Sequence, residues 1–216
     1  MQAAALDARS VCALVLAGGR ATRMGGLDKG LQPFQGQPLA ALALDRLRRQ
    51  SAGTPGLLAI SANRNLPNYQ SLGVPVWTDS VPDFAGPLAG FLAATRQCQS
   101  KYPYLLTVPC DSPRFPLDLL QRLGAALMQQ QVSIAMALAP DAQESDGTLH
   151  AQPVFCLLRT DLADNLQAFL ESGGRKIGAW TASQGQVKVP FNAPGDDPRA
   201  FANANTLDDL HQLETR

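Results

Sequence analysis

A glycine-rich stretch that could bind phosphate occupies residues 16–30, with the sequence "LAGGRATRMGGLDKG". Gly18 and Gly19 leave no side chain between the backbone N–H groups and a ligand, so successive N–H groups can surround an anion. Three cationic side chains follow in the same stretch, namely Arg20, Arg23 and Lys29. N–H donors combined with full positive charges predict an anion site, in which Asp28 could orient the neighbouring lysine.

This stretch matches neither of two widespread phosphate-binding motifs. The pattern G-x-x-x-x-G-K-[ST] is absent, because Lys29 stands between Asp28 and Gly30, and G-x-G-x-x-G is absent as well. The alternative interpretation is a glycine-rich turn that joins a strand to a helix and leaves its charges in solvent. Three cations within about ten residues favour the anion site over that alternative.

The elements that must position this stretch follow from the hydrophobic pattern. Short apolar runs predict strands at 11–17, 57–62, 74–78, 104–109, 132–139, 153–159 and 186–191. Helical spacing predicts helices within 38–50, 87–98, 116–130, 160–172, 173–183 and 206–214. Thr160 is a plausible N-cap for the fourth of them. Strands that alternate with helices indicate an α/β fold, with a mostly parallel central sheet and helices on both faces.

Two aspartates come directly after predicted strands. Asp111 follows the run 104–109, and Asp79 follows the run 74–78. In open α/β sheets, ligands bind beyond the carboxyl ends of the strands, so a carboxylate at such a position points into the ligand crevice. The alternative is that each aspartate makes a turn or caps a helix.

Composition narrows the class of protein. The chain has 216 residues, of which 45% are hydrophobic and 17% are charged, and its 18 basic residues balance its 18 acidic ones. No global field therefore favours nucleic acid or a membrane surface as a partner. The four cysteines form no C-x-x-C pair and the two histidines stand apart, which argues against a zinc site. The run 11–17 is too short to span a membrane, so a reduced, cytoplasmic protein is expected.

The motif L-A-G-G-x-x-x-R-M-G-G-x-D-K-G-L resembles the molybdenum cofactor guanylyltransferases of the MobA type, a family of nucleotidyltransferases. Further segments resemble that family in the same order along the chain: "ISANRN" (60–65), "WTDSVPDFAGPLAG" (77–90), "VPCDSPRFP" (108–116) and "FANANTLDDL" (201–210). The resemblance implies a Rossmann-like nucleotidyltransferase fold in a single domain over 1–216. Residues 1–10 form an N-terminal extension, 11–115 mainly the GTP and magnesium half, and 116–216 mainly the acceptor half.

The resemblance also implies a reaction and its site residues. GMP passes from Mg-GTP to the terminal phosphate of molybdopterin, or molybdenum-molybdopterin, and pyrophosphate leaves. The implied nucleotide-binding residues are Leu16, Ala17, Gly18, Gly19, Lys29, Asn63, Asp79 and Asp111. The implied acceptor-binding residues are Gly86, Gly90, Asn203 and Asn205. The implied catalytic residues are Lys29, Arg23 and Asp111, with Asp111 as the ligand of Mg²⁺.

Each of these residues also has an ordinary structural interpretation. Asn63 could make an Asx-turn, and Gly86 with the following proline could simply begin a helix. Asn203 and Asn205 could cap the last helix. Lys29 could be a solvated loop lysine.

Other functions remain open at this point. A cytidylyltransferase would use CTP on the same acceptor, and a sugar-1-phosphate nucleotidyltransferase has a similar core. A GTP or pterin carrier without turnover is the alternative of a different class. Molybdoenzymes, their chaperones and the molybdenum-insertion protein are the protein partners that the resemblance implies.

Overall fold

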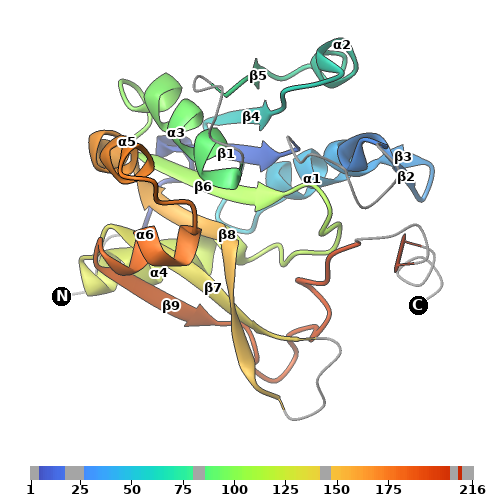
Figure 1. Cartoon of the computed structure of the whole chain (residues 1–216). Helices are drawn as coiled ribbons and strands as arrows, with labels where there is room; N and C mark the ends of the chain where they lie inside the picture. Colours follow the sequence, from blue (N-terminus) through green and yellow to red (C-terminus); the bar gives the residue numbers. More distant parts are fainter. Residues whose placement is uncertain (1–4, 18–26, 80–85, 142–146, 205–208, 211–216) are drawn as a thin grey trace.

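The computed structural model describes residues 5–17, 27–79, 86–141, 147–204 and 209–210 (Figure 1). The described strands of the main sheet lie in the order β5-β4-β1-β6-β8-β7-β9. Their bounds are β1 (Val11–Leu16), β4 (Leu57–Ser61), β5 (Val76–Trp77), β6 (Tyr104–Pro109), β7 (Ile134–Pro140), β8 (Leu149–Arg159) and β9 (Gln186–Pro190). The helices are α1 (Leu39–Arg48), α2 (Leu66–Gln70), α3 (Pro87–Cys98), α4 (Leu119–Gln130), α5 (Ala163–Glu171) and α6 (Ile177–Ala182).

The sheet is mostly parallel, as the sequence predicts. β1 pairs in parallel with both β4 and β6, β4 with β5, and β7 with β9. β8 is the exception, because it pairs antiparallel with β6 and with β7. No described helix separates β7 from β8, and a parallel connection would need a crossover of a dozen or more residues.

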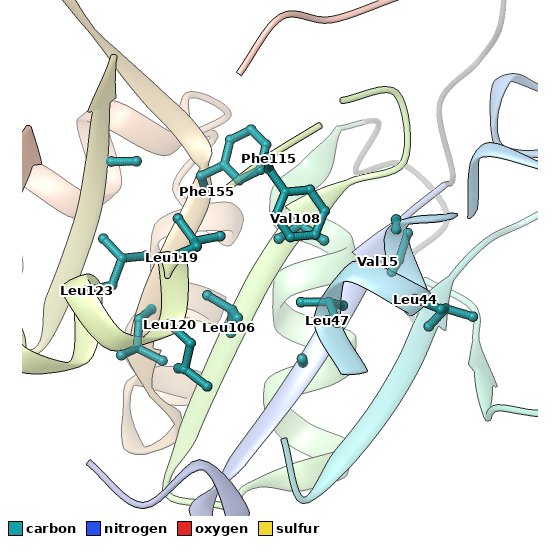
Figure 2. Close-up of a cluster of buried hydrophobic side chains, with 14 of the residues drawn as sticks. Val15, Leu44, Leu47, Leu106, Val108, Phe115, Leu119, Leu120, Leu123 and Phe155 are labelled. Carbon is teal, nitrogen blue, oxygen red and sulfur yellow. The ribbon is translucent and has the colours of Figure 1, made fainter. Parts of the chain in front are cut away.

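Helices cover both faces of the sheet, and β1 shows why. Five of its six residues are buried, so the strand reads as one apolar run. Its odd-numbered residues face a cluster with side chains of α1 and α4, and its even-numbered residues face a cluster with α3, α5 and α6. Figure 2 shows part of the first cluster, to which α1 contributes Leu44 and Leu47, β1 contributes Val15, β6 contributes Leu106 and Val108, and α4 contributes three leucines.

Several boundaries differ from the expected ones. α4 begins at Leu119 rather than near 116, and β8 begins at Leu149, inside the polar segment 140–152. Thr160 does not cap α5, because a short 3-10 helix, η4 (Thr160–Leu162), precedes it and the Thr160 hydroxyl donates to the carbonyl of Tyr102 instead. The expected helix at 206–214 lies mostly outside the described residues.

Two small features after β1 were not predicted from the sequence. The 3-10 helix η3 (Lys29–Leu31) leads into a two-stranded hairpin of β2 (Pro33–Phe34) and β3 (Gln37–Pro38). Its turn residues, Gln35 and Gly36, both have positive φ, as a tight hairpin turn requires.

No described helix is long and apolar enough to cross a membrane.

Candidate functional site

The carboxyl ends of β1, β4, β5 and β6 meet at one edge of the sheet. Leu16 at the end of β1 lies level with Ser61 of β4 on one side and with Pro109 of β6 on the other. The backbone continues the pairing one step further, since the N–H of Ala17 donates to Ser61 and the N–H of Cys110 donates to Leu16. Residues that follow these strands therefore lie side by side at this edge.

An ion pair joins the glycine-rich segment to the loop after β6. The Lys29 Nζ donates to the Asp111 Oδ2 at 3.0 Å, although the residues lie 82 positions apart. The side chains are 24% and 18% exposed, so both are partly shielded and still reachable from solvent. This geometry places a cation and a carboxylate together where a parallel strand ends.

The Asp28 carboxylate is held by other residues than Lys29. Tyr69 and Asn65 both donate to it, and Asp28 as a whole residue is 9% exposed. These contacts anchor Asp28, the residue just before η3, and its expected role in orienting the neighbouring lysine stays a prediction. Nothing in the sequence around Tyr69 indicates this contact.

Asn63 and Asp79 form a reciprocal pair at the ends of β4 and β5. The Asn63 Nδ2 donates to the Asp79 Oδ2 at 2.7 Å, and the Asp79 N–H donates to the Asn63 Oδ1 at 2.9 Å. Within the described part of the chain, no donor reaches the buried Asp79 Oδ1. Burial raises the pKa of Asp79, and the hydrogen bond from Asn63 opposes that shift. A buried acceptor without a partner is costly, so a ligand donor at this position would offset that cost.

The segment after β9 returns to the loop of Asp111 (Figure 1). The Ala204 N–H donates to the Asp111 carbonyl at 2.8 Å, and the buried Ser112 hydroxyl donates to the Asn203 Oδ1 at 2.5 Å. Asn203 thus lies next to the loop that carries Asp111, and its amide oxygen accepts the hydrogen bond from Ser112. The contact of Ser112 was not predicted, although its position directly after Asp111 was visible in the sequence.

Comparison with known proteins identifies the family of the chain. The family model described as MobA-like NTP transferase domain matches residues 13–187. The chain belongs to this family. Relatives of this MobA-like chain are named molybdenum cofactor guanylyltransferase. The relative from Acidovorax sp. (strain JS42) is 54% identical, with 97% of each chain covered. The relative from Albidiferax ferrireducens is 53% identical, with 97% of this chain and 98% of the relative covered.

Solved structures show the same fold at low sequence identity. The molybdopterin-guanine dinucleotide biosynthesis protein A from Archaeoglobus fulgidus has a TM-score of 0.71 at 20% identity, over 94% of this chain and 97% of that one. The 4-diphosphocytidyl-2C-methyl-D-erythritol synthase from Anaerococcus prevotii has a TM-score of 0.73 at 10% identity, over 97% and 96%. These neighbours confirm the Rossmann-like nucleotidyltransferase fold of the MobA-like domain.

The remaining site residues stand as follows. Leu16 and Ala17 lie at the end of β1, as expected. Four members of the predicted site lie outside the described residues, namely Gly18, Gly19, Arg23 and Asn205, as does Arg20. Their roles in this MobA-like domain, and those of the other site residues, stay predictions.

Gly86 and Gly90 both belong to the start of α3, where the sequence predicts contact with the acceptor. Gly86 is the N-cap and has a φ of 150°, and a proline follows it at the first helical position. A Cβ on Gly90 would lie 2.7 Å from the Leu16 Cδ2 and 2.7 Å from the Ser61 Oγ. The geometry thus explains Gly90 by the close approach of α3 to β1 and β4, and its acceptor-binding role stays a prediction.

Gly90→Ala is expected to destabilise the MobA-like fold, because its methyl group would overpack this contact. Overpacking costs roughly 1–3 kcal/mol, and the better helix propensity of alanine returns up to about 1 kcal/mol, so a net cost of up to about 2 kcal/mol, or a fall in Tm of up to about 8 °C, is expected for a chain of this size. The matched control is Gly178→Ala in α6, where a Cβ would meet nothing within 4 Å, and its Tm should stay the same or rise slightly. Thermal unfolding measures both. An unchanged Tm with a raised KM for the acceptor would instead make Gly90 a binding residue.

Proposed function

We propose that this chain transfers GMP from GTP to the terminal phosphate of molybdopterin, giving molybdopterin guanine dinucleotide and pyrophosphate. The relatives at 53–54% identity over nearly the whole chain carry the name of this activity. The observation in the structure that carries the proposal is the ion pair of Lys29 with Asp111 at the carboxyl end of β6. It supplies a cation for phosphates and a carboxylate for a metal at the point where the fold binds ligands.

The reaction needs no strong protein base. The nucleophile is the phosphate monoester of the pterin, which is already ionised near neutral pH. The chain's task is to hold two anions in line and to stabilise the charge that develops as pyrophosphate leaves.

Lys29 and Asp111 divide that task. The Lys29 ammonium is a compact charge on a flexible stem, so it can follow the phosphates from the bound triphosphate to the leaving pyrophosphate. In the structure the Lys29 ammonium pairs with the Asp111 carboxylate. A bound nucleotide would draw the ammonium towards its phosphates and leave the carboxylate available to a metal ion. The Asp79 Oδ1, which has no partner among the described residues, offers an acceptor to a donor group of the nucleotide.

The residues present fit Mg²⁺ as the cofactor. The Asp111 carboxylate is a hard oxygen ligand and remains 18% exposed. Mg²⁺ takes one or two protein carboxylates and keeps its other positions for water and substrate phosphates, so Asp111 would suffice to hold it. When bound, the ion would supply positive charge next to the α-phosphate and the leaving group.

We assign residues 11–115 mainly to the nucleotide and 116–216 mainly to the acceptor, with Asn203 and Asn205 on the acceptor side. The bond from Ala204 to the Asp111 carbonyl supports this assignment, because it joins the two halves at the reacting centre. We also propose a cytoplasmic location, which suits four free, buried cysteines. Molybdoenzymes or their chaperones, and the protein that inserts molybdenum, are the proposed protein partners.

A nucleotide panel tests the guanylyl assignment. In calorimetric titrations with Mg²⁺, GTP is expected to bind on the order of a hundredfold more tightly than CTP, ATP or UTP, because a pocket that hydrogen-bonds one base leaves polar groups unpaired with another. Equal affinity for CTP would overturn the assignment in favour of a cytidylyltransferase. Release of pyrophosphate on mixing GTP with molybdopterin separates an enzyme from a carrier.

A further inference from the structure

A buried network surrounds the Asp28 carboxylate. The Tyr69 hydroxyl donates to the Asp28 Oδ1 at 2.5 Å, and the Asn65 Nδ2 donates to the Asp28 Oδ2 at 2.9 Å. Tyr69 is fully buried in α2, and Asn65 is the residue just before that helix. Both oxygens of a buried carboxylate are therefore held by a segment 37 to 41 residues further along the chain.

Asp28 in turn fixes the backbone that carries Lys29. The Asp28 carbonyl accepts hydrogen bonds from the Leu31 N–H at 3.2 Å and from the Gln32 Nε2 at 3.0 Å, which close the turn of η3. The carboxylate thus ties the first residue of this turn to α2, and the carbonyl ties it to the end of the turn.

Gly30 brings the same turn into direct contact with Tyr69. A Cβ on Gly30 would lie 2.5 Å from the Tyr69 hydroxyl oxygen and 3.2 Å from the Ala17 Cβ. A side chain there would have to displace the Tyr69 hydroxyl, so the backbone on the far side of Lys29 lies against the tyrosine as well. Figure 1 shows α2 on the side toward which the arrows of β1, β4 and β6 point, which is the edge of the proposed site.

We propose that Tyr69 is a positioning residue for the transfer of GMP: its hydroxyl, together with the Asn65 amide, fixes Asp28 and so holds Lys29 at Asp111 and the nucleotide phosphates. This inference rests on the proposed function. A long lysine side chain loses conformational entropy when its ammonium is held in one place. A fixed backbone at Lys29 lowers that entropic cost, because fewer conformations of the residue are accessible before the contact forms. Burial and the hydrogen bond to Asp28 both raise the pKa of Tyr69, so the hydroxyl keeps its proton and stays a donor.

Tyr69→Phe tests the hydroxyl while it keeps the ring in the core. It is expected to lower kcat about tenfold, because the loss of one hydrogen bond to a charged group loosens the position of Lys29. The matched control is Tyr102→Phe, whose hydroxyl donates at 3.1 Å to the Gly56 carbonyl, ahead of β4 and β6 and so away from the site. Its kcat should stay within twofold of the wild type.

A double-mutant cycle separates positioning from general stabilisation. If Tyr69 acts through Lys29, Tyr69→Phe costs about tenfold in the wild-type background and less than twofold in a Lys29→Ala background. Equal losses in both backgrounds, or no loss in the wild type, would overturn the inference. The Kd of Mg-GTP is measured in the same cycle, so a variant that turns over too slowly to assay still gives an answer.

Two further measurements keep the outcome unambiguous. Should Tyr69→Phe fail to fold, Asn65→Gly takes its place in the cycle, because glycine accepts the φ of 50° at this position and removes the side chain whose amide donates to Asp28. A wild-type protein that binds GTP but transfers no GMP to molybdopterin would overturn the proposed function, whereas the cycle on Kd would still test the positioning of Lys29.

Discussion

Asp111→Asn is expected to lower Mg²⁺-dependent turnover by about 10²–10³-fold, with GTP binding in the absence of metal changed far less. Asparagine keeps the shape of the side chain but loses the charge that would hold the cation. An aspartate that only makes a turn tolerates this change well, because both residues form Asx-turns. The substitution therefore separates a metal ligand from a turn residue, and steady-state rates over a series of Mg²⁺ concentrations measure it.

The matched control for this change is Asp118→Asn. Asp118 precedes α4 and pairs with Arg122 at 3.5 Å, and its side chain is 42% exposed. Its turnover should stay within twofold of the wild type, since exposed pairs contribute little. An Asp111→Asn variant with the rate and Mg²⁺ dependence of the wild type would show that Asp111 is not the metal ligand, and Asp79 would be tested next.

Lys29→Ala is expected to lower kcat/KM for GTP about ten- to a hundredfold while the fold stays intact. The reason is the loss of a charge-assisted contact with the phosphates, worth roughly 1.5–3 kcal/mol. Kinetics with GTP and molybdopterin, together with the Tm, measure the two parts of this prediction. Lys29→Arg should restore only part of the loss, because a planar guanidinium is not a compact ammonium.

Lys101→Ala is the matched control for the lysine. Its ammonium lies over the ring of Tyr102, 5.5 Å from the centroid, ahead of β6, and its loss should leave the kinetics unchanged. Wild-type kinetics in Lys29→Ala would show that Lys29 makes no contact that matters to the reaction. Unfolding of Lys29→Ala would show that its ion pair with Asp111 is structural.

Some elements could be predicted from the sequence to the residue. The bounds of α3 and β6 match the expected ones, because a proline begins the helix and an apolar run that ends in a proline forms the strand. The direction of β8 could not be predicted, since an apolar run has the same pattern in either orientation. The hairpin β2–β3 and the five-residue α2 are too short to have a detectable period, and their tertiary contacts stabilise them.

The proposed site was predictable where it follows from strand ends and the family motif. The sequence places four site residues near the carboxyl ends of the parallel strands, and the structure brings them into two contacting pairs. These pairs are Lys29 with Asp111 and Asn63 with Asp79. Tyr69 could not be predicted, because its partner lies 41 residues away and a tyrosine in a short helix is more often simply a core residue. Contacts between distant segments depend on how the helices and strands pack, and the local sequence pattern around Tyr69 carries no information about that packing.

The antiparallel strand β8 has a consequence for the biosynthesis of the chain. β6 is complete at Pro109, but the strand that pairs with its free edge is made only at 149–159. While the nascent chain grows, a hydrophobic strand edge is therefore open to any extended segment nearby, and β7 cannot close it because β8 lies between them. A chain released early would keep that edge exposed, which makes premature termination between these strands a route to aggregation and gives chaperones a specific surface to protect.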